Sequence, residues 1–109
     1  MEFLRFRVTL LVVITSFMQR QVDLTSLVDA FLSLKNKHEI ESFLSDILTK
    51  SEQKTLIMRL RVARMLEEGL PYKHIEKETG ASSATIAKIS EFLRYGYDGY
   101  RTVINKTKV

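Results

Sequence analysis

The sequence lacks several features that define other classes of protein. It has no cysteine, which excludes a disulfide framework and a thiolate zinc site and is typical of a reducing compartment such as the cytoplasm. It contains one proline and four glycines among its 109 residues, so helix-breaking residues are scarce. A chain of this length builds one small core or shares a core with a second copy. We therefore predict a single all-α domain in the cytoplasm.

Residues with catalytic or metal-binding potential are also few. The two histidines, His38 and His74, lie 36 positions apart, and the sequence has neither a Gly-rich phosphate loop nor two histidines at helical metal-binding spacing. The acidic pairs near Glu67 and Glu76 are typical of solvated helix faces. We expect neither an enzyme, nor a metal site, nor a cofactor.

Charge is distributed unevenly along the chain. Residues 1–48 carry five Lys or Arg and six Asp or Glu, a net charge of −1, whereas residues 49–109 carry twelve and seven, a net charge of +5. A polyanionic partner is therefore expected to bind the C-terminal half.

The first 22 residues differ from the rest and are treated as an apolar extension. Their apolar run from Val8 to Met18 is eleven residues long, too short to cross a bilayer, which takes about 20. No small-residue cleavage site follows it, so targeting is the least favoured interpretation. Two others remain open. One is an ordered strand or helix packed on the rest of the chain, of which the β-branched residues favour the strand. The other is a start assigned upstream of the biological one, with Met18 as the initiator.

Apolar spacing and capping residues predict about six helices. Asp23 can cap a first helix that ends near residue 34, and Asn36 a second from about 38 to 48. Thr49 and Glu52 have the spacing of a capping box, which predicts a central helix over 50–68 that stops at Gly69.

The C-terminal half contains three shorter predicted helices. Pro71 suits the first turn of a helix over 71–79, which Gly80 ends. The next begins at Ser82 or Ser83 and ends near residue 93, and a short last helix follows "RYGYDGY". The tyrosines of that stretch can stack on bases, but packing against the core is favoured.

Two short helices joined by a glycine turn are the pattern of a helix-turn-helix motif. Apolar residues face back toward the core at Ile75, Ile86 and Ile89, and Gly80 tolerates the positive φ of the turn. Ala81 is small enough to act as a wedge between the helices. The motif places the second helix in the major groove of double-stranded DNA.

The outward residues of this motif are suited to a groove about 12 Å wide. Small side chains begin the second helix and allow close approach, while cations on both helices can reach phosphates. The predicted DNA-binding residues are Lys73, His74, Lys77, Ser82, Ser83, Ala84, Thr85, Ala87 and Lys88.

The segments "RLRVARMLEEG", "YKHIEKETGASSATIAKI" and "YGYDGY" resemble the YerC/YecD group of Trp-repressor-related bacterial proteins, and more distantly the tryptophan repressor. The resemblance covers residues 24–104. It implies an intertwined homodimer whose N-terminal helices form one core and whose helix-turn-helix units face successive major grooves. Residues 23–105 would form this helix-turn-helix domain, and the resemblance implies a transcriptional regulator that acts as a repressor.

The resemblance does not carry the tryptophan site over intact. Arg59 matches the first of two arginines that hold the indole in the repressor, and Thr49 matches a threonine near that pocket. Lys88 replaces the second arginine, and Ile89 replaces a glycine that leaves room for the ligand. Because lysine lacks a planar guanidinium, we predict weak or no tryptophan binding. Two alternatives remain open: that another small molecule acts as the effector, and that the domain is a protein-interaction module that binds no DNA.

Overall fold

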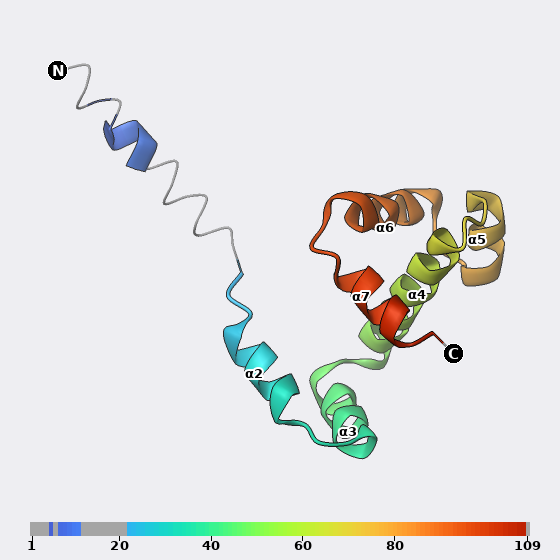
Figure 1. Cartoon of the computed structure of the whole chain (residues 1–109), viewed down its shortest axis with the longest axis horizontal. Helices are drawn as coiled ribbons and strands as arrows, with labels where there is room; N and C mark the ends of the chain where they lie inside the picture. The colour runs from blue at the N-terminus through green and yellow to red at the C-terminus, as the bar shows by residue number, and fades with distance from the viewer. Residues whose placement is uncertain (1–4, 6, 12–21, 109) are drawn as a thin grey trace. The chain divides into compact units, whose positions relative to one another are not determined.

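The computed structural model describes residues 5, 7–11 and 22–108 (Figure 1). Over this part of the chain the structure is helical and contains no strand, which confirms the all-α prediction. The helices are α2 (Thr25–Ser33), α3 (Lys37–Ile47), α4 (Lys50–Glu67), α5 (Tyr72–Thr79), α6 (Ser83–Tyr95) and α7 (Gly99–Lys106). None of the helices described is long and apolar enough to cross a membrane.

Part of the N-terminal extension is described. Residues 7–11 are helical, so the strand favoured for this run is wrong over these positions. Their side chains are exposed, including Val8, Leu10 and Leu11. Met18, the alternative initiator, lies outside the described residues.

The chain divides into an N-terminal unit, residues 1–41, and a C-terminal unit, residues 42–109. In the N-terminal unit Asp23 accepts hydrogen bonds from the Thr25 hydroxyl at 2.6 Å and from its backbone N–H at 2.9 Å. Leu24 occupies the N-cap position of α2, so Asp23 caps from one residue further out than predicted. Asn36 accepts from the Glu39 N–H at 3.0 Å, as its predicted role at the start of α3 requires.

Neither α2 nor α3 contains a buried residue. Several apolar positions of α2 recur at helical spacing and are exposed, among them Leu27, Val28 and Leu32. These side chains gain little hydrophobic stabilisation within one copy of the chain.

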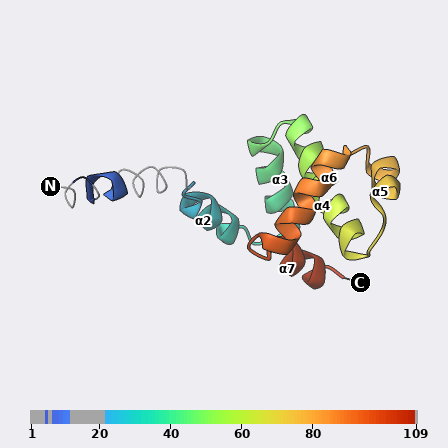
Figure 2. The same ribbon diagram turned by 90° about the horizontal axis from the view of Figure 1, so that it is seen from above.

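The C-terminal unit is built on α4, which packs against α5, α6 and α7 (Figure 2). This arrangement agrees with the prediction of a central third helix. Buried side chains come from all four helices and from the turn after α5: Val62, Ala63, Ile75, Ala81, Ile86, Ile89, Leu93 and Ile104. Tyr100 packs on this core, whereas Tyr95 and Tyr97 are exposed. Core packing is therefore confirmed for Tyr100 and wrong for the other two.

Capping groups fix both ends of α4. Thr49 accepts from the Glu52 N–H at 3.1 Å, and the Glu52 carboxylate accepts from the Thr49 N–H at 2.9 Å, which is the predicted capping box. At the other end Gly69 has φ +77°, and the N–H groups of Gly69 and Leu70 donate to the carbonyls of Leu66 and Met65. These two bonds form a Schellman motif, which requires the left-handed conformation that glycine adopts readily.

Candidate nucleic-acid interface

The helix-turn-helix consists of α5, residues 80–82 and α6. Gly80 has φ +73°, and its N–H donates to the Glu76 carbonyl at 2.9 Å. The Thr79 hydroxyl donates to the Ile75 carbonyl at 2.6 Å and accepts from the Ala81 N–H at 3.2 Å. The turn is therefore held by its own hydrogen bonds as well as by the left-handed residue.

Packing on the inner side of the motif follows the sequence prediction. Ile75 from α5 and Ile86 and Ile89 from α6 are fully or almost fully buried, and the small Ala81 is buried between them. Ile86, Ile89 and Leu93 form the inward face of α6, and Ser83, Ala84, Ala87 and Lys88 on the other side of the helix are exposed.

Ser82 starts α6 as its N-cap. Its hydroxyl oxygen accepts from the Thr85 N–H at 3.2 Å and lies 2.9 Å from the Thr85 hydroxyl. Thr85 is half-buried. The structure thus gives Ser82 the capping role expected of it and pairs the hydroxyls of two predicted DNA-binding residues.

The predicted contact residues lie on exposed surfaces of the motif. Exposed positions on α6 are Ser83, Ala84, Ala87 and Lys88, and those on α5 are Lys73, His74 and Lys77. Among the described residues, the three lysines form no salt bridge within the motif or outside it. Their ammonium groups are available to an external anion.

Sequence reasoning missed one charged residue of the same surface. Glu91 is exposed on α6, one turn beyond Lys88. It lies seven residues after Ala84 and four after Ala87, on the same side of the helix. The helical spacing of the predicted contact residues was therefore a signal in the sequence that pointed to Glu91. A carboxylate at this position would repel phosphates, and it separates Lys88 from the next exposed cation of α6, Arg94 in the last turn.

Of the three residues predicted for a ligand pocket, Arg59 is the one that lines a cavity beside the start of α4. Arg59 lines a cavity of about 470 Å³ with Leu48, Ser51, Glu52, Thr55, Leu56 and Tyr100. Thr49 and Lys88 are not among these lining residues, and the Thr49 side chain is engaged in the capping box. Ile89 is only 1% exposed within the core.

A second, more apolar hollow lies between α6 and α7. It is lined by Leu60, Phe92, Gly96, Tyr97, Gly99, Tyr100 and Val103 and also measures about 470 Å³. Phe92, Tyr97 and Val103 are exposed around it. Within the described residues, no group of three or more side chains is placed to hold a metal ion in either hollow or elsewhere.

The fold and the motif define this chain as an all-helical protein of the helix-turn-helix class. The family model of the Trp repressor protein matches residues 22–108, and the chain belongs to this family. The match begins at the end of the N-terminal extension and includes every helix from α2 to α7.

Individual relatives agree with this family. The chain is 44% identical over 89 residues to the uncharacterized protein YerC of Bacillus subtilis, a match that covers 82% of this chain and 86% of that one. A crystal structure of a presumed Trp repressor from Staphylococcus aureus has 38% identity and a TM-score of 0.72, covering 82% and 89% of the two chains. A TrpR-like protein from Eubacterium eligens has 41% identity and a TM-score of 0.71, covering 75% and 84%.

Proposed function

We propose that the protein is a sequence-specific DNA-binding transcriptional regulator, of the repressor type, in which α6 enters the major groove. The observation that carries this proposal is the geometry of α6. Ile86 and Ile89 bury one face of the helix, while the opposite face presents small side chains and then Lys88. Such a face can approach base edges closely. Residues 23–105 would form the DNA-binding domain, and the protein would act in the cytoplasm, where bacterial DNA lies.

The α5 surface would position the motif on the DNA. Lys73 and Lys77 are exposed one helical turn apart, with His74 beside them. Contacts from such side chains to phosphates fix register without reading sequence. On α6, Ser83 can donate to a phosphate or base edge, and Ala84 and Ala87 can contact thymine methyl groups.

We further propose that the regulator acts as an intertwined homodimer. Apolar side chains are exposed on α2 and α3 and also on the C-terminal unit, at Ile47, Leu56, Ile57, Phe92 and Val103. A second copy would cover these surfaces and bury the N-terminal helices. A dimer would also present two α6 helices to successive major grooves, as palindromic sites require.

Tryptophan is not the proposed effector. The Ile89 side chain is packed in the core, in the position where the family resemblance places a glycine that makes room for the indole. Lys88 supplies a point charge rather than a stacking plane. Calorimetric titration with L-tryptophan should therefore detect no binding at micromolar concentrations.

The experiment that tests the proposed function is a gel-shift assay with duplex DNA from the region upstream of the protein's own gene. Lys88→Ala and Ser83→Val should weaken the shift, because each removes one expected contact from both protomers. Lys106→Ala is the matched control, since it removes one charge from α7, outside the motif. Equal binding by Lys88→Ala and the wild type, or no binding by either, would favour the alternative of a protein-interaction module.

A further inference from the structure

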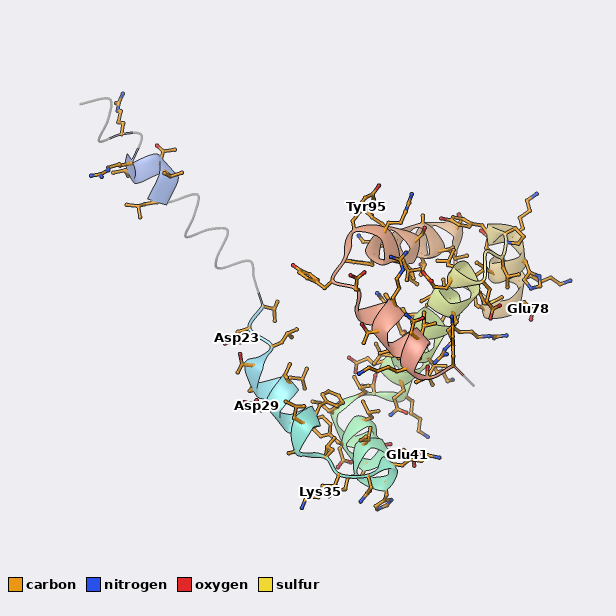
Figure 3. The ribbon with its side chains drawn as sticks, viewed as in Figure 1. Asp23, Asp29, Lys35, Glu41, Glu78 and Tyr95 are labelled. Carbon is orange, nitrogen blue, oxygen red and sulfur yellow. The ribbon has the colours of Figure 1, made fainter. Side chains whose placement is uncertain are left out.

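One side-chain link connects the central helix to the helix-turn-helix. The Arg61 guanidinium on α4 donates from Nη1 to the backbone carbonyl of Glu78 at 2.9 Å. Its Nη2 lies 3.7 Å from the Glu78 carboxylate oxygen Oε2. Glu78 is labelled on α5 in Figure 3. One planar group therefore holds both the main chain and the side chain of a single residue.

The residue that Arg61 holds, Glu78, is the second-to-last residue of α5, two positions before Gly80 begins the turn. Carbonyls in the last turn of a helix have no partner within the helix, and a cation there is also favoured by the helix dipole. Thr79 and Gly80 follow Glu78, and their hydrogen bonds close the turn from within. Arg61 adds a restraint from outside the motif, because it ties the end of α5 to α4.

The link also has an electrostatic consequence. Glu78 belongs to the same short helix as Lys73, His74 and Lys77, and it lies one turn from His74. Without Arg61 its carboxylate would add an uncompensated negative charge beside the surface that is proposed to meet phosphates.

The strength of the link favours a role in geometry over a role in stability. The side chains of Arg61 and Glu78 are 54% and 43% exposed, and ion pairs in such surroundings contribute little to folding. The planar fork of arginine nevertheless fixes direction, which a lysine ammonium does not.

We propose that Arg61 is a positioning residue that fixes the end of α5 against α4 and so sets the angle at which α6 meets DNA. This inference rests on the proposed DNA-binding function. It requires no contact between Arg61 and the DNA.

The test compares two charge-preserving variants of the full chain, Arg61→Lys and Arg101→Lys. The control pair joins α7 to α4, with Arg101 Nε donating to Glu67 Oε1 at 3.0 Å, and it is exposed to a similar degree. The probes are a duplex that the wild-type protein selects from a random pool and a scrambled duplex of the same composition. Affinity for both probes, the salt slope and the thermal midpoint are measured.

Arg61→Lys should lower affinity for the selected duplex by about threefold per protomer, the scale of one exposed ion pair, and so by about tenfold for a dimer. Affinity for the scrambled duplex and the salt slope should stay unchanged, because the charge is retained. Arg101→Lys should shift the thermal midpoint to a similar small extent and leave the preference between the two duplexes intact.

Three results would overturn the inference: an unchanged preference in Arg61→Lys, an equal loss for both duplexes, or the same loss of preference in Arg101→Lys. Glu78→Gln gives a further check. This variant keeps the backbone carbonyl that accepts from Arg61. Its preference for the selected duplex over the scrambled duplex should therefore fall less than that of Arg61→Lys. If the wild-type protein selects no duplex from the pool, the proposed function fails and not merely the role of Arg61.

Discussion

The N-terminal and C-terminal units use amphipathic helices in different ways. The C-terminal unit buries eight apolar residues, seven on α4, α5, α6 and α7 and one, Ala81, in the turn after α5. The helix α2 has a similar apolar pattern but no buried residue, and Leu32 is 78% exposed. The apolar pattern of the sequence is therefore enough to specify a helix in both units. Burying the apolar side chains of that helix also requires neighbouring helices to pack against, and a single copy of the chain provides them in the C-terminal unit.

The largest expected effect comes from opening the core of the C-terminal unit. Ile86→Ala should lower the free energy of unfolding by about 2–5 kcal/mol, because it leaves a cavity beneath α6. Val22→Ala in the N-terminal unit removes an exposed apolar group and should change it by less than about 0.5 kcal/mol. Urea denaturation followed by circular dichroism measures both. Equal costs would show that the two units do not differ in burial as described.

The second prediction tests whether a partner covers α2. Val28→Asp introduces a charge on its apolar surface and should weaken dimerisation by about 2–4 kcal/mol, as substitutions at the centre of an interface do. Ser26→Asp adds the same charge to the same helix and is the control. Sedimentation equilibrium over a range of protein concentrations reports the change. A dimer that is equally stable in both variants would place the interface elsewhere.

The third prediction concerns the turn of the helix-turn-helix. Gly80→Ala meets no atom within 4 Å, but it forces alanine into a conformation with φ +73°. The cost should be about 1–2 kcal/mol from backbone strain alone. Gly99→Ala, which also meets no atom within 4 Å and has no positive φ, should cost less. Thermal unfolding compares the two variants, and equal costs would contradict the strain argument.

The smallest effect is a difference in acid sensitivity between the units. Hydrogen bonds from Thr49, chiefly from its backbone N–H, lower the pKa of Glu52 below its ordinary value. The Thr25 hydroxyl and N–H lower the pKa of Asp23 in the same way. A lowered pKa in the folded protein stabilises the fold above the ordinary pKa, and this contribution disappears as the pH falls through the lowered value.

The two carboxylates are distinguished by replacing each with its amide. Glu52→Gln keeps the hydrogen bonds of a capping box but cannot ionise, so the urea midpoint of the C-terminal unit should fall less steeply below about pH 5. Asp23→Asn should leave that dependence unchanged, because Asp23 lies in the N-terminal unit and the helix that follows it, α2, has no buried residue. The same acid dependence in wild type and Glu52→Gln would exclude a role for this carboxylate.

Local chemistry made much of the fold predictable. The burial of Ile75 was predicted from apolar spacing and is confirmed, although it depends on the packing of α5 against α4 and α6. The capping box of Thr49 and Glu52 and the left-handed Gly69 and Gly80 depend on neighbours within a few residues, and the structure confirms each. For the same reason the predicted helix ends lie within about two residues of those observed.

Two kinds of feature were less predictable: those for which propensity alone is a weak guide, and those that join distant segments. Residues 7–11 are of the first kind, since they form a helix although the β-branched residues of this run favour a strand. The Arg61–Glu78 link joins positions 17 residues apart, and no periodicity marks it. The ligand residues came from a resemblance, and of the three only Arg59 lines the cavity beside the start of α4. The DNA contacts remain predictions.

The most direct test of DNA binding by the C-terminal unit is the salt dependence of its affinity for duplex DNA. Lys73, Lys77 and Lys88 would give six phosphate contacts in a dimer, so the logarithm of the binding constant should fall against the logarithm of salt concentration with a slope of about −5. Affinity should then drop by about a thousandfold between 50 and 200 mM salt. A slope near zero, or no binding at low salt, would contradict the account.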